Sequence, residues 1–240
     1  MFAFMNRSTA TVDPLLLAPF AHLGAGTCDL LCHLATIYHL KAREALFCQG
    51  DEAHSFYIVA EGGVRLVEYT SDGGAVALKL YGPGEMFGLL AVSGAYPYPA
   101  TAEAIDDSVI IGWRGSDARE LVKQCPDFGL ILIDGLVTHV HQAHTKIRHL
   151  SADRVDRRII RAVLNYAEKF GSERVGSVSI DVPLTQQALA EYTNTTVETV
   201  NRTLKLLERQ GLIRCARQHV DVLEPVKLMY MAGDEVAMQG

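Results

Sequence analysis

The stretch LTQQALAEYTNTTVETVNRTLKLLERQGLI, residues 184–213, decides the fold of this chain. Its pattern predicts two short helices joined by a tight turn. Thr185 is placed to cap the first helix, and Asn194 lies at the turn, where a residue that tolerates the left-handed region is needed. Thr195 and Glu198 are spaced as a capping box at the start of the second helix. The stretch is therefore predicted to be a helix–turn–helix.

The second helix is predicted to have one apolar and one polar face, and to stop at Gly211. The stripe expected to face inward consists of Val197, Val200, Leu204 and Leu207. The opposite stripe consists of Glu198, Asn201, Arg202 and Lys205. Arginine can donate twice to guanine and glutamate can accept from the cytosine amine, so this stripe suits the major groove of DNA. The alternative is a merely solvated helix face, and the helix–turn–helix spacing favours DNA recognition.

The run TVETVNR (residues 196–202) followed by LLERQGLI resembles the winged-helix end of the Crp/Fnr transcription regulators. Upstream, FCQGDEAHSFYIVAEGGVRL and YGPGEMFGLLAVSG are similar to the glycine-bearing turns of that family's cyclic-nucleotide-binding-like sensor domain. The resemblance covers nearly the whole chain. It implies a homodimeric regulator that binds double-stranded DNA and contacts RNA polymerase.

The chain is expected to have an α+β fold in three parts. Between residues 37 and 113, short apolar runs are broken by Gly, Asp and Pro, which is typical of a β-barrel or jelly-roll. We therefore expect a sensor domain in residues 1–124, a dimerisation helix and hinge in 125–152, and a winged helix–turn–helix domain with a C-terminal tail in 153–240.

Smaller elements are also predicted. Residues beyond Glu224 are expected to be loosely ordered. The other expected elements are a lead-in helix around residues 15–17, a helix over 155–170, a strand over 175–182, and wing strands at 212–215 and 219–223.

A heptad pattern runs along the helix expected after Cys125. Apolar or small residues step by four and three, as the a and d positions of a two-stranded coiled coil do. A helix packed on its own domain is the alternative, but the strict heptad favours a parallel dimer seam. Residues 151–153 break the pattern and are the expected hinge. The seam starts after Gly129 and comprises Ile133, Leu136, Val140, Ala143, Ile147 and Leu150.

The net charge of −6 is unevenly distributed. Residues 1–152 carry 10 Lys and Arg against 16 Asp and Glu, whereas residues 153–223 carry 11 against 9. The tail carries 1 against 3. The small basic surplus coincides with the predicted recognition helix, where phosphate binding needs it.

Cysteine usage and hydropathy indicate a cytoplasmic protein with no membrane partner. An odd number of scattered cysteines is typical of a reducing compartment. No apolar run reaches the roughly 18 residues of a membrane-spanning helix, and the N-terminus lacks the pattern of a secretion signal. The five cysteines are Cys28, Cys32, Cys48, Cys125 and Cys215.

The resemblance also indicates what the sensor domain does not bind. In family members that bind cyclic AMP, a Glu after a Phe-Gly pair holds the ribose and a later Arg-Ser pair holds the phosphate. In this chain Leu89 stands at the Glu position, and Pro99 and Ala100 stand at the Arg-Ser pair. A cyclic nucleotide would be buried with its charge unpaired, so cyclic AMP is not expected to bind.

The sequence therefore does not identify the effector. The dimer-helix residues that meet the effector in the family correspond to Ala143 and His144. The expected pocket comprises Leu89, Tyr96, Pro99, Ala100, Ala143 and His144.

Three readings of the sensor remain. QGDEAHSFY and PATAEA resemble the family's nitric-oxide-responsive denitrification regulators, and a haem held by His22 or His144 would sense nitric oxide or carbon monoxide. An apolar pocket for an unknown ligand, or no ligand at all, are the alternatives. An iron–sulfur cluster is disfavoured because the cysteines do not match the family's closely spaced N-terminal cluster.

By resemblance, Glu198 and Arg202 occupy the positions at which the family reads the TGA of each half-site. Arg202 is expected to donate to the guanine, and Glu198 to accept from the opposite cytosine amine. Asn201 replaces the usual Ser or Gly, so the outer base of a TTGAT-like half-site is open, and Val197 is expected to touch a thymine methyl. Phosphate contacts are expected from Thr185, Gln187, Thr196 and Thr199.

Two rival functions are disfavoured. A cupin-type enzyme with an appended winged helix would need metal ligands on its strands. The strand region offers only His39 and His54, without an HxH pair. We therefore expect no enzymatic activity. A winged helix that binds protein rather than DNA is the third reading, and an Arg202→Ala variant would distinguish it in a DNA-binding assay.

Overall fold

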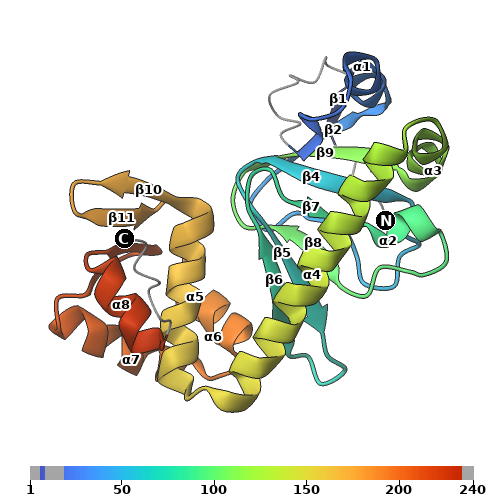
Figure 1. Cartoon of the computed structure of the whole chain (residues 1–240). Helices are drawn as coiled ribbons and strands as arrows, with labels where there is room; N and C mark the ends of the chain where they lie inside the picture. Colours follow the sequence, from blue (N-terminus) through green and yellow to red (C-terminus); the bar gives the residue numbers. More distant parts are fainter. Residues whose placement is uncertain (1–5, 9–18, 234–240) are drawn as a thin grey trace. The chain divides into compact units, whose positions relative to one another are not determined.

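The computed structural model describes residues 6–8 and 19–233, which belong to two compact units (Figure 1). Unit 1 takes in the chain up to Ser71 together with Lys79–Ala143, and unit 2 takes in Asp72–Leu78 and the chain from His144 onward. The lead-in helix predicted around residues 15–17 lies outside the described residues. Among the described residues, no helix combines the length and apolarity needed to cross a membrane.

The predicted β-structure of the sensor region is confirmed. Within the described residues, a five-stranded sheet has the order β1-β2-β9-β4-β7 and a four-stranded sheet the order β3-β8-β5-β6. The first sheet comprises β1 (Asn6–Ser8), β2 (Thr36–Leu40), β9 (Ser108–Arg114), β4 (Ser55–Glu61) and β7 (Met86–Phe87). The second comprises β3 (Ala45–Phe47), β8 (Thr101–Ala104), β5 (Val64–Tyr69) and β6 (Ala75–Tyr81).

One apolar core joins the first sheet to the helices of unit 1. Its largest member is Trp113 of β9, whose ring meets Phe20 edge-on and Phe56 in a stack. The indole Nε1 donates to the Leu31 carbonyl at 2.8 Å, so its polar atom is satisfied in the core. The helices of this unit are α1 (Ala25–Leu34), α2 (Leu90–Ser93), α3 (Gly115–Gln124) and the first part of α4 (Pro126–Ala152).

A second core fills the space between the two sheets with aromatic rings. Phe47 and Tyr98 stack with their centroids 3.6 Å apart, and Tyr57 stacks on Phe87 at 5.3 Å. The Tyr98 hydroxyl donates to the Ser55 carbonyl, and burial raises the pKa of Tyr57 above its ordinary value. The small side chains of Ala102 and Ala104 on β8 lie in the same cluster. The interior of this β-structure is thus packed largely by the chain's own rings.

Helix α4 is the predicted long helix, and it begins directly after Cys125 as expected. Phe128 and Leu132 are buried, so the start of the helix packs on unit 1. Gly135 permits this approach, because a Cβ there would lie 3.0 Å from the Leu89 and Met86 side chains. The predicted seam residues Ile133, Leu136, Val140 and Ile147 are between 45% and 60% exposed. Ala143 is also exposed, and Leu150 is half-buried.

Unit 2 holds the winged helix–turn–helix. Helix α5 (Val155–Phe170) ends at Gly171 as predicted. A four-stranded sheet within the described residues has the order β10-β11-β13-β12. It comprises β10 (Gly171–Arg174), β11 (Ser177–Ile180), β13 (His219–Val222) and β12 (Ile213–Ala216). Strands β12 and β13 form the predicted wing, with Gln218 at positive φ in the turn between them. The helices that complete the unit are α6 (Gln186–Thr193), α7 (Val197–Arg209) and α8 (Pro225–Ala232).

Two predictions for unit 2 are wrong in detail. The strand predicted over residues 175–182 begins only at Ser177, because Gly176 has φ +74° and lies in a hairpin turn with β10. The tail expected to be loose beyond Glu224 contains α8, which packs on α5. Leu228 and Ala232, one helical turn apart, are fully buried, and this apolar pair stabilises the helix.

Candidate nucleic-acid interface

Helix α6 begins and ends as the sequence predicts. The Thr185 hydroxyl oxygen accepts from the Ala188 amide at 3.0 Å and caps the helix N-terminus. Asn194 follows the last residue with φ 49° and ψ 59°, in the left-handed region. Leu189 is buried against the rest of the unit. The turn before the second helix is therefore sharp, and Asn194 forms it in the left-handed conformation that this residue type tolerates.

Arg158 of α5 fixes this turn from outside it. Its Nε donates to the Thr193 carbonyl at 3.2 Å and its Nη2 to the Asn194 carbonyl at 3.4 Å. These carbonyls are among those left without partners where α6 ends. Arg158 was not predicted from the sequence, because several arginines occur in α5 and nothing in their spacing distinguishes one of them.

The cap of α7 is one residue later than predicted. Thr196, not Thr195, is the N-cap, and its hydroxyl oxygen accepts from the Thr199 amide at 3.2 Å. The Thr195 amide donates to the Ala190 carbonyl at 3.0 Å and so still belongs to the turn. The predicted capping box of Thr195 and Glu198 is therefore wrong. Glu198 lies in the first turn of α7 and is exposed.

The two faces of α7 are confirmed except at Val197. Val200, Leu204 and Leu207 are buried, as the apolar stripe predicts. Val197 is 38% exposed, because it is the first residue of the helix and its side chain lies beside the polar stripe. Its assignment to the inward stripe is wrong. Gly211, at φ +69°, follows the helix C-cap Gln210 as the predicted stop.

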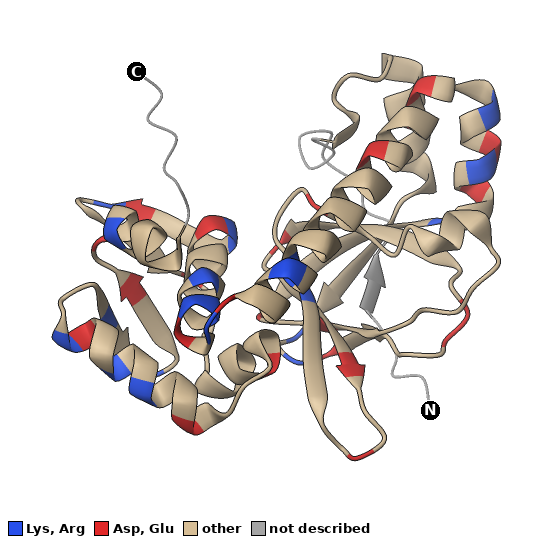
Figure 2. Ribbon diagram, turned by 60° about the horizontal axis from the view of Figure 1, so that its bottom comes forward, with Lys and Arg blue, Asp and Glu red and all other residues tan. Residues whose placement is uncertain are grey.

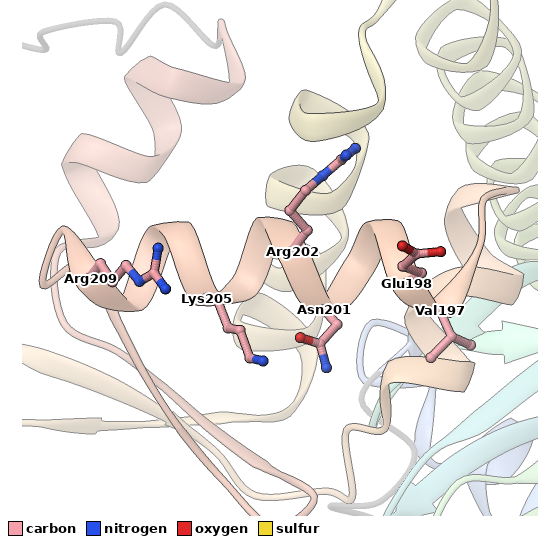
Figure 3. A pocket seen from close by; sticks show the side chains of 6 residues that line it. All are labelled: Val197, Glu198, Asn201, Arg202, Lys205 and Arg209. Carbon is pink, nitrogen blue, oxygen red and sulfur yellow. The ribbon is translucent and has the colours of Figure 1, made fainter.

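The polar stripe of α7 lines a shallow surface groove. Figure 3 shows the six side chains that line it, with Asn201 and Lys205 projecting together on one side of the helix. Lys and Arg positions recur along α7 (Figure 2). Arg209, which was not predicted from the sequence, extends the stripe one turn beyond Lys205. The lining residues are Val197, Glu198, Asn201, Arg202, Lys205 and Arg209.

The predicted phosphate-contacting residues lie at the N-terminal ends of α6 and α7. Thr185 and Thr196 are the two N-caps. Thr199 lies 3.0 Å from Thr196, oxygen to oxygen. Gln187 is exposed, and its amide donates to Glu191 at 2.9 Å. Helix N-termini carry free amides and a partial positive charge, which suits phosphate.

The predicted effector-pocket residues lie in different surroundings. Leu89 belongs to the core cluster around Trp113, and Ala100 is 1% exposed. Tyr96 and Pro99 are exposed in the segment before β8, with Tyr96 at 65%. Ala143 and His144 are exposed on α4. An effector pocket made of these residues stays a prediction.

The candidate metal and haem ligands are likewise spread out. His22 and His144 are both exposed. The five cysteines are free thiols, and Cys28 has its sulfur 3.6 Å from the carbonyls of Phe20 and Leu23. Within the described part of the chain, no three His, Cys, Asp or Glu side chains are grouped to hold a metal ion.

Comparison with known proteins decides the family. Residues 37–125 match the cyclic nucleotide-binding domain, and residues 157–231 match the Crp-like helix–turn–helix domain. The transcriptional regulator LdrP of Thermus thermophilus is 31% identical over 194 residues, covering 80% of this chain and 94% of its own. The chain belongs to the Crp/Fnr family of transcription regulators.

Other members of the Crp/Fnr family extend this relationship. The nitrogen fixation regulation protein FixK of Bradyrhizobium diazoefficiens is 25% identical over 200 residues, covering 83% of each chain. The crystal structure of a Crp/Fnr regulator from Thermus thermophilus matches with a TM-score of 0.69 and 26% identity, over 82% of this chain and 98% of that one. The fold class predicted from sequence is confirmed, and the protein is a DNA-binding regulator rather than an enzyme.

Proposed function

We propose that this Crp/Fnr regulator acts as a homodimer on an inverted repeat with TGA in each half-site. One observation carries the proposal: the exposed stripe of α7 presents Glu198 and Arg202 near the N-terminal end of the second helix of a helix–turn–helix. The N-terminal part of a recognition helix is the part that reaches base edges. Arg202 donates to the guanine, and Glu198 accepts from the cytosine amine of the opposite strand. Val197, 38% exposed at the start of the stripe, contacts a thymine methyl.

The homodimer rests on the surface of α4. Four of its six exposed large apolar side chains lie at the a and d positions of the heptad, and a contiguous apolar stripe of this kind marks an interaction surface. A second copy of the same helix supplies the matching stripe in a symmetric dimer. The exposed members are Leu130, Ile133, Leu136, Val137, Val140 and Ile147.

A direct experiment compares three labelled duplexes by fluorescence anisotropy. The first carries two TGA half-sites as an inverted repeat, with centres about one helical turn apart. The second retains one half-site, and in the third both TGA sequences are scrambled. The proposal requires the order of affinity to be two half-sites, then one, then none. Equal affinity for all three would mean that binding is only electrostatic.

The proposed sensor does not respond to cyclic AMP. Leu89 is packed in an apolar core and cannot accept from a ribose hydroxyl. Pro99 is exposed and lacks even an N–H for a phosphate oxygen. The space between the sheets is occupied by stacked rings such as Phe47 and Tyr98. His22 and His144, the candidate haem ligands, are both exposed rather than enclosed in an apolar pocket. The nitric-oxide-responsive subtype stays a prediction from the sequence.

We also propose the partners and location that follow from this role. A regulator bound beside a promoter acts through RNA polymerase, which the family relationship supports. We therefore propose that the protein is cytoplasmic, where it has access to DNA and RNA polymerase.

Saturating cyclic AMP is expected to leave the thermal unfolding temperature unchanged. A ligand at 100 to 1,000 times its dissociation constant would add about 2.7–4.1 kcal/mol to the native state and raise that temperature by several degrees. The measurement is differential scanning calorimetry with cyclic AMP, with 5′-AMP as the control for general nucleotide effects. A rise in unfolding temperature with cyclic AMP but not with 5′-AMP would contradict the proposal that Leu89 and Pro99 preclude cyclic AMP binding.

Thr196→Ala is expected to weaken binding to cognate and scrambled duplexes by similar factors. Its hydroxyl lies at the N-terminus of α7, where it contacts phosphate and caps the helix. Loss of the cap also costs about 0.5–2 kcal/mol of stability. Thr196→Ser keeps the hydroxyl and is the matched control, expected to bind nearly as the wild type does. A change in preferred sequence, measured on duplexes with single base-pair changes, would show that Thr196 reads a base.

A further inference from the structure

Asn201 has a hydrogen-bond partner on the other helix of the helix–turn–helix. Its side-chain Nδ2 donates to Oε1 of Gln186 at 3.0 Å, although the two residues are fifteen positions apart in sequence. Gln186 is the first residue of α6 and is exposed, and Asn201 is half-buried in the groove of α7. This contact joins the start of the first helix to the base-facing stripe of the second.

From this contact we propose that Gln186 is a positioning residue for base readout: it fixes the Asn201 amide so that the dimer prefers an A·T pair at the base pair outside TGA. The inference rests on the proposed function and names the base pair that the family resemblance leaves open. Gln186 itself need not touch a base. It acts through the orientation of Asn201.

The donor and acceptor inventory explains the preference. An asparagine side chain has two N–H donors and one carbonyl oxygen. Gln186 accepts one of these donors, which leaves one N–H and the carbonyl oxygen for DNA. This remaining set is the one that pairs with N7 and the N6 amine of adenine in the major groove.

Immobilising the amide is what makes the readout selective. A free asparagine can rotate its amide by half a turn and present N–H groups where the carbonyl had been, and it would then fit a guanine edge as well as an adenine edge. While the Gln186 oxygen accepts one N–H, the carbonyl oxygen of Asn201 keeps a fixed place. Val197 and Lys205, one turn to either side, flank Asn201 in the groove. Neither of these two residues has an amide, so Asn201 supplies the amide side chain of the stripe.

The neighbouring glutamine offers a matched comparison. Gln187 is also exposed and also at the start of α6, but its Nε2 donates to Glu191 of the same helix at 2.9 Å. It is therefore placed to affect phosphate contacts without touching Asn201. Removing either glutamine side chain changes the same helix end by the same number of atoms, so a difference in base preference between the two variants reports on Asn201.

The test measures dissociation constants of the full-length protein for four inverted-repeat duplexes that differ only at the base pair outside each TGA. The wild type is expected to prefer A·T over G·C pairs there by roughly 5-fold or more, the lower end for a bidentate amide contact. Asn201→Ala is expected to lose that preference. Gln186→Ala is expected to reduce it by roughly two- to tenfold, the scale of one orienting hydrogen bond. All variants are expected to keep their requirement for TGA.

Three further variants sharpen the result. In Gln186→Glu the carboxylate can only accept from Asn201, so this variant is expected to keep the A·T preference. Its added negative charge repels the DNA phosphates and is expected to weaken binding to all four duplexes. Gln187→Ala is expected to lower affinity for the four duplexes by a common factor. The Asn201→Ala, Gln186→Ala double variant is expected to match Asn201→Ala in preference, because the glutamine acts only through the asparagine.

Two results would overturn this inference without affecting the proposed function. One is a Gln186→Ala protein that keeps the full A·T preference. The other is a double variant that loses more of the A·T preference than Asn201→Ala does. In both cases a wild type that still requires TGA would leave the proposed function intact. If the wild type itself ignored TGA, the proposed function would fail, and the inference would fail with it. The thermal unfolding temperature of Gln186→Ala should stay close to that of the wild type, since the hydrogen bond between Gln186 and Asn201 is exposed to solvent.

Discussion

Val140→Glu is expected to convert the dimer into monomers and to abolish tight binding to the inverted repeat. Val140 is 50% exposed at the centre of the heptad on α4, so two copies meet there in the proposed seam. Two glutamates at that point would be buried together without a cationic partner, at a cost of several kcal/mol. Because each monomer carries one recognition helix, the loss of the dimer also removes one half-site contact. Sedimentation velocity and anisotropy on the same samples measure both effects.

The control for this variant is Thr138→Glu. Thr138 is exposed on the same helix, two positions before Val140 and off the heptad seam. Thr138→Glu adds the same charge to the same helix, and we expect this variant to remain a dimer with unchanged DNA binding. A Val140→Glu protein that sedimented as a dimer would mean that the exposed apolar stripe of α4 has another partner.

Arg202→Ala is expected to cost roughly 1–3 kcal/mol at the cognate site and to remove discrimination at the guanine of TGA alone. The guanidinium is exposed in the groove of α7, where a base edge can reach it. Lys205→Ala, one turn further along, is the comparison. It is expected to weaken all sequences by a similar factor and to lower the salt dependence of binding by about one counterion.

The measurement is a set of dissociation constants for duplexes carrying each base at the guanine position, at several salt concentrations. An Arg202→Ala protein that still prefers guanine would assign the readout to another side chain. A uniform loss over all four bases would make Arg202 a phosphate contact.

Much of unit 2 could be predicted from local sequence, since its signals are short-range. Thr185 marks the start of α6 through its side-chain cap, Asn194 marks the end through its left-handed backbone, and Gly171 marks the end of α5. The error at Thr195 has a physical cause: two adjacent threonines can both cap, and the choice depends on whether the Thr195 amide is already bonded to Ala190. A capping rule that uses side chains alone does not contain that bond.

The rest of the site depends on contacts between distant parts of the sequence. Arg158 reaches carbonyls 35 and 36 residues away, and the bond between Gln186 and Asn201 requires the two helices to be already docked. Helix α8 has local signals that were not recognised in the sequence, since Pro225 begins it and Gly233 ends it in the left-handed region, and burial of Leu228 stabilises it further. The effector pocket was placed by resemblance alone. The stacking of Phe47 on Tyr98, which fills the β-structure, joins strand β3 to the segment before β8 and has no local signature.

Selection of binding sites by the wild-type protein from a pool of random duplexes tests directly whether it reads an inverted repeat of TGA. We predict an enriched inverted repeat with TGA in each half, the halves centred about one helical turn apart. We also predict an A·T pair outside each TGA. Enrichment of unrelated sequences, or of a single unrepeated half-site, would contradict the proposed function.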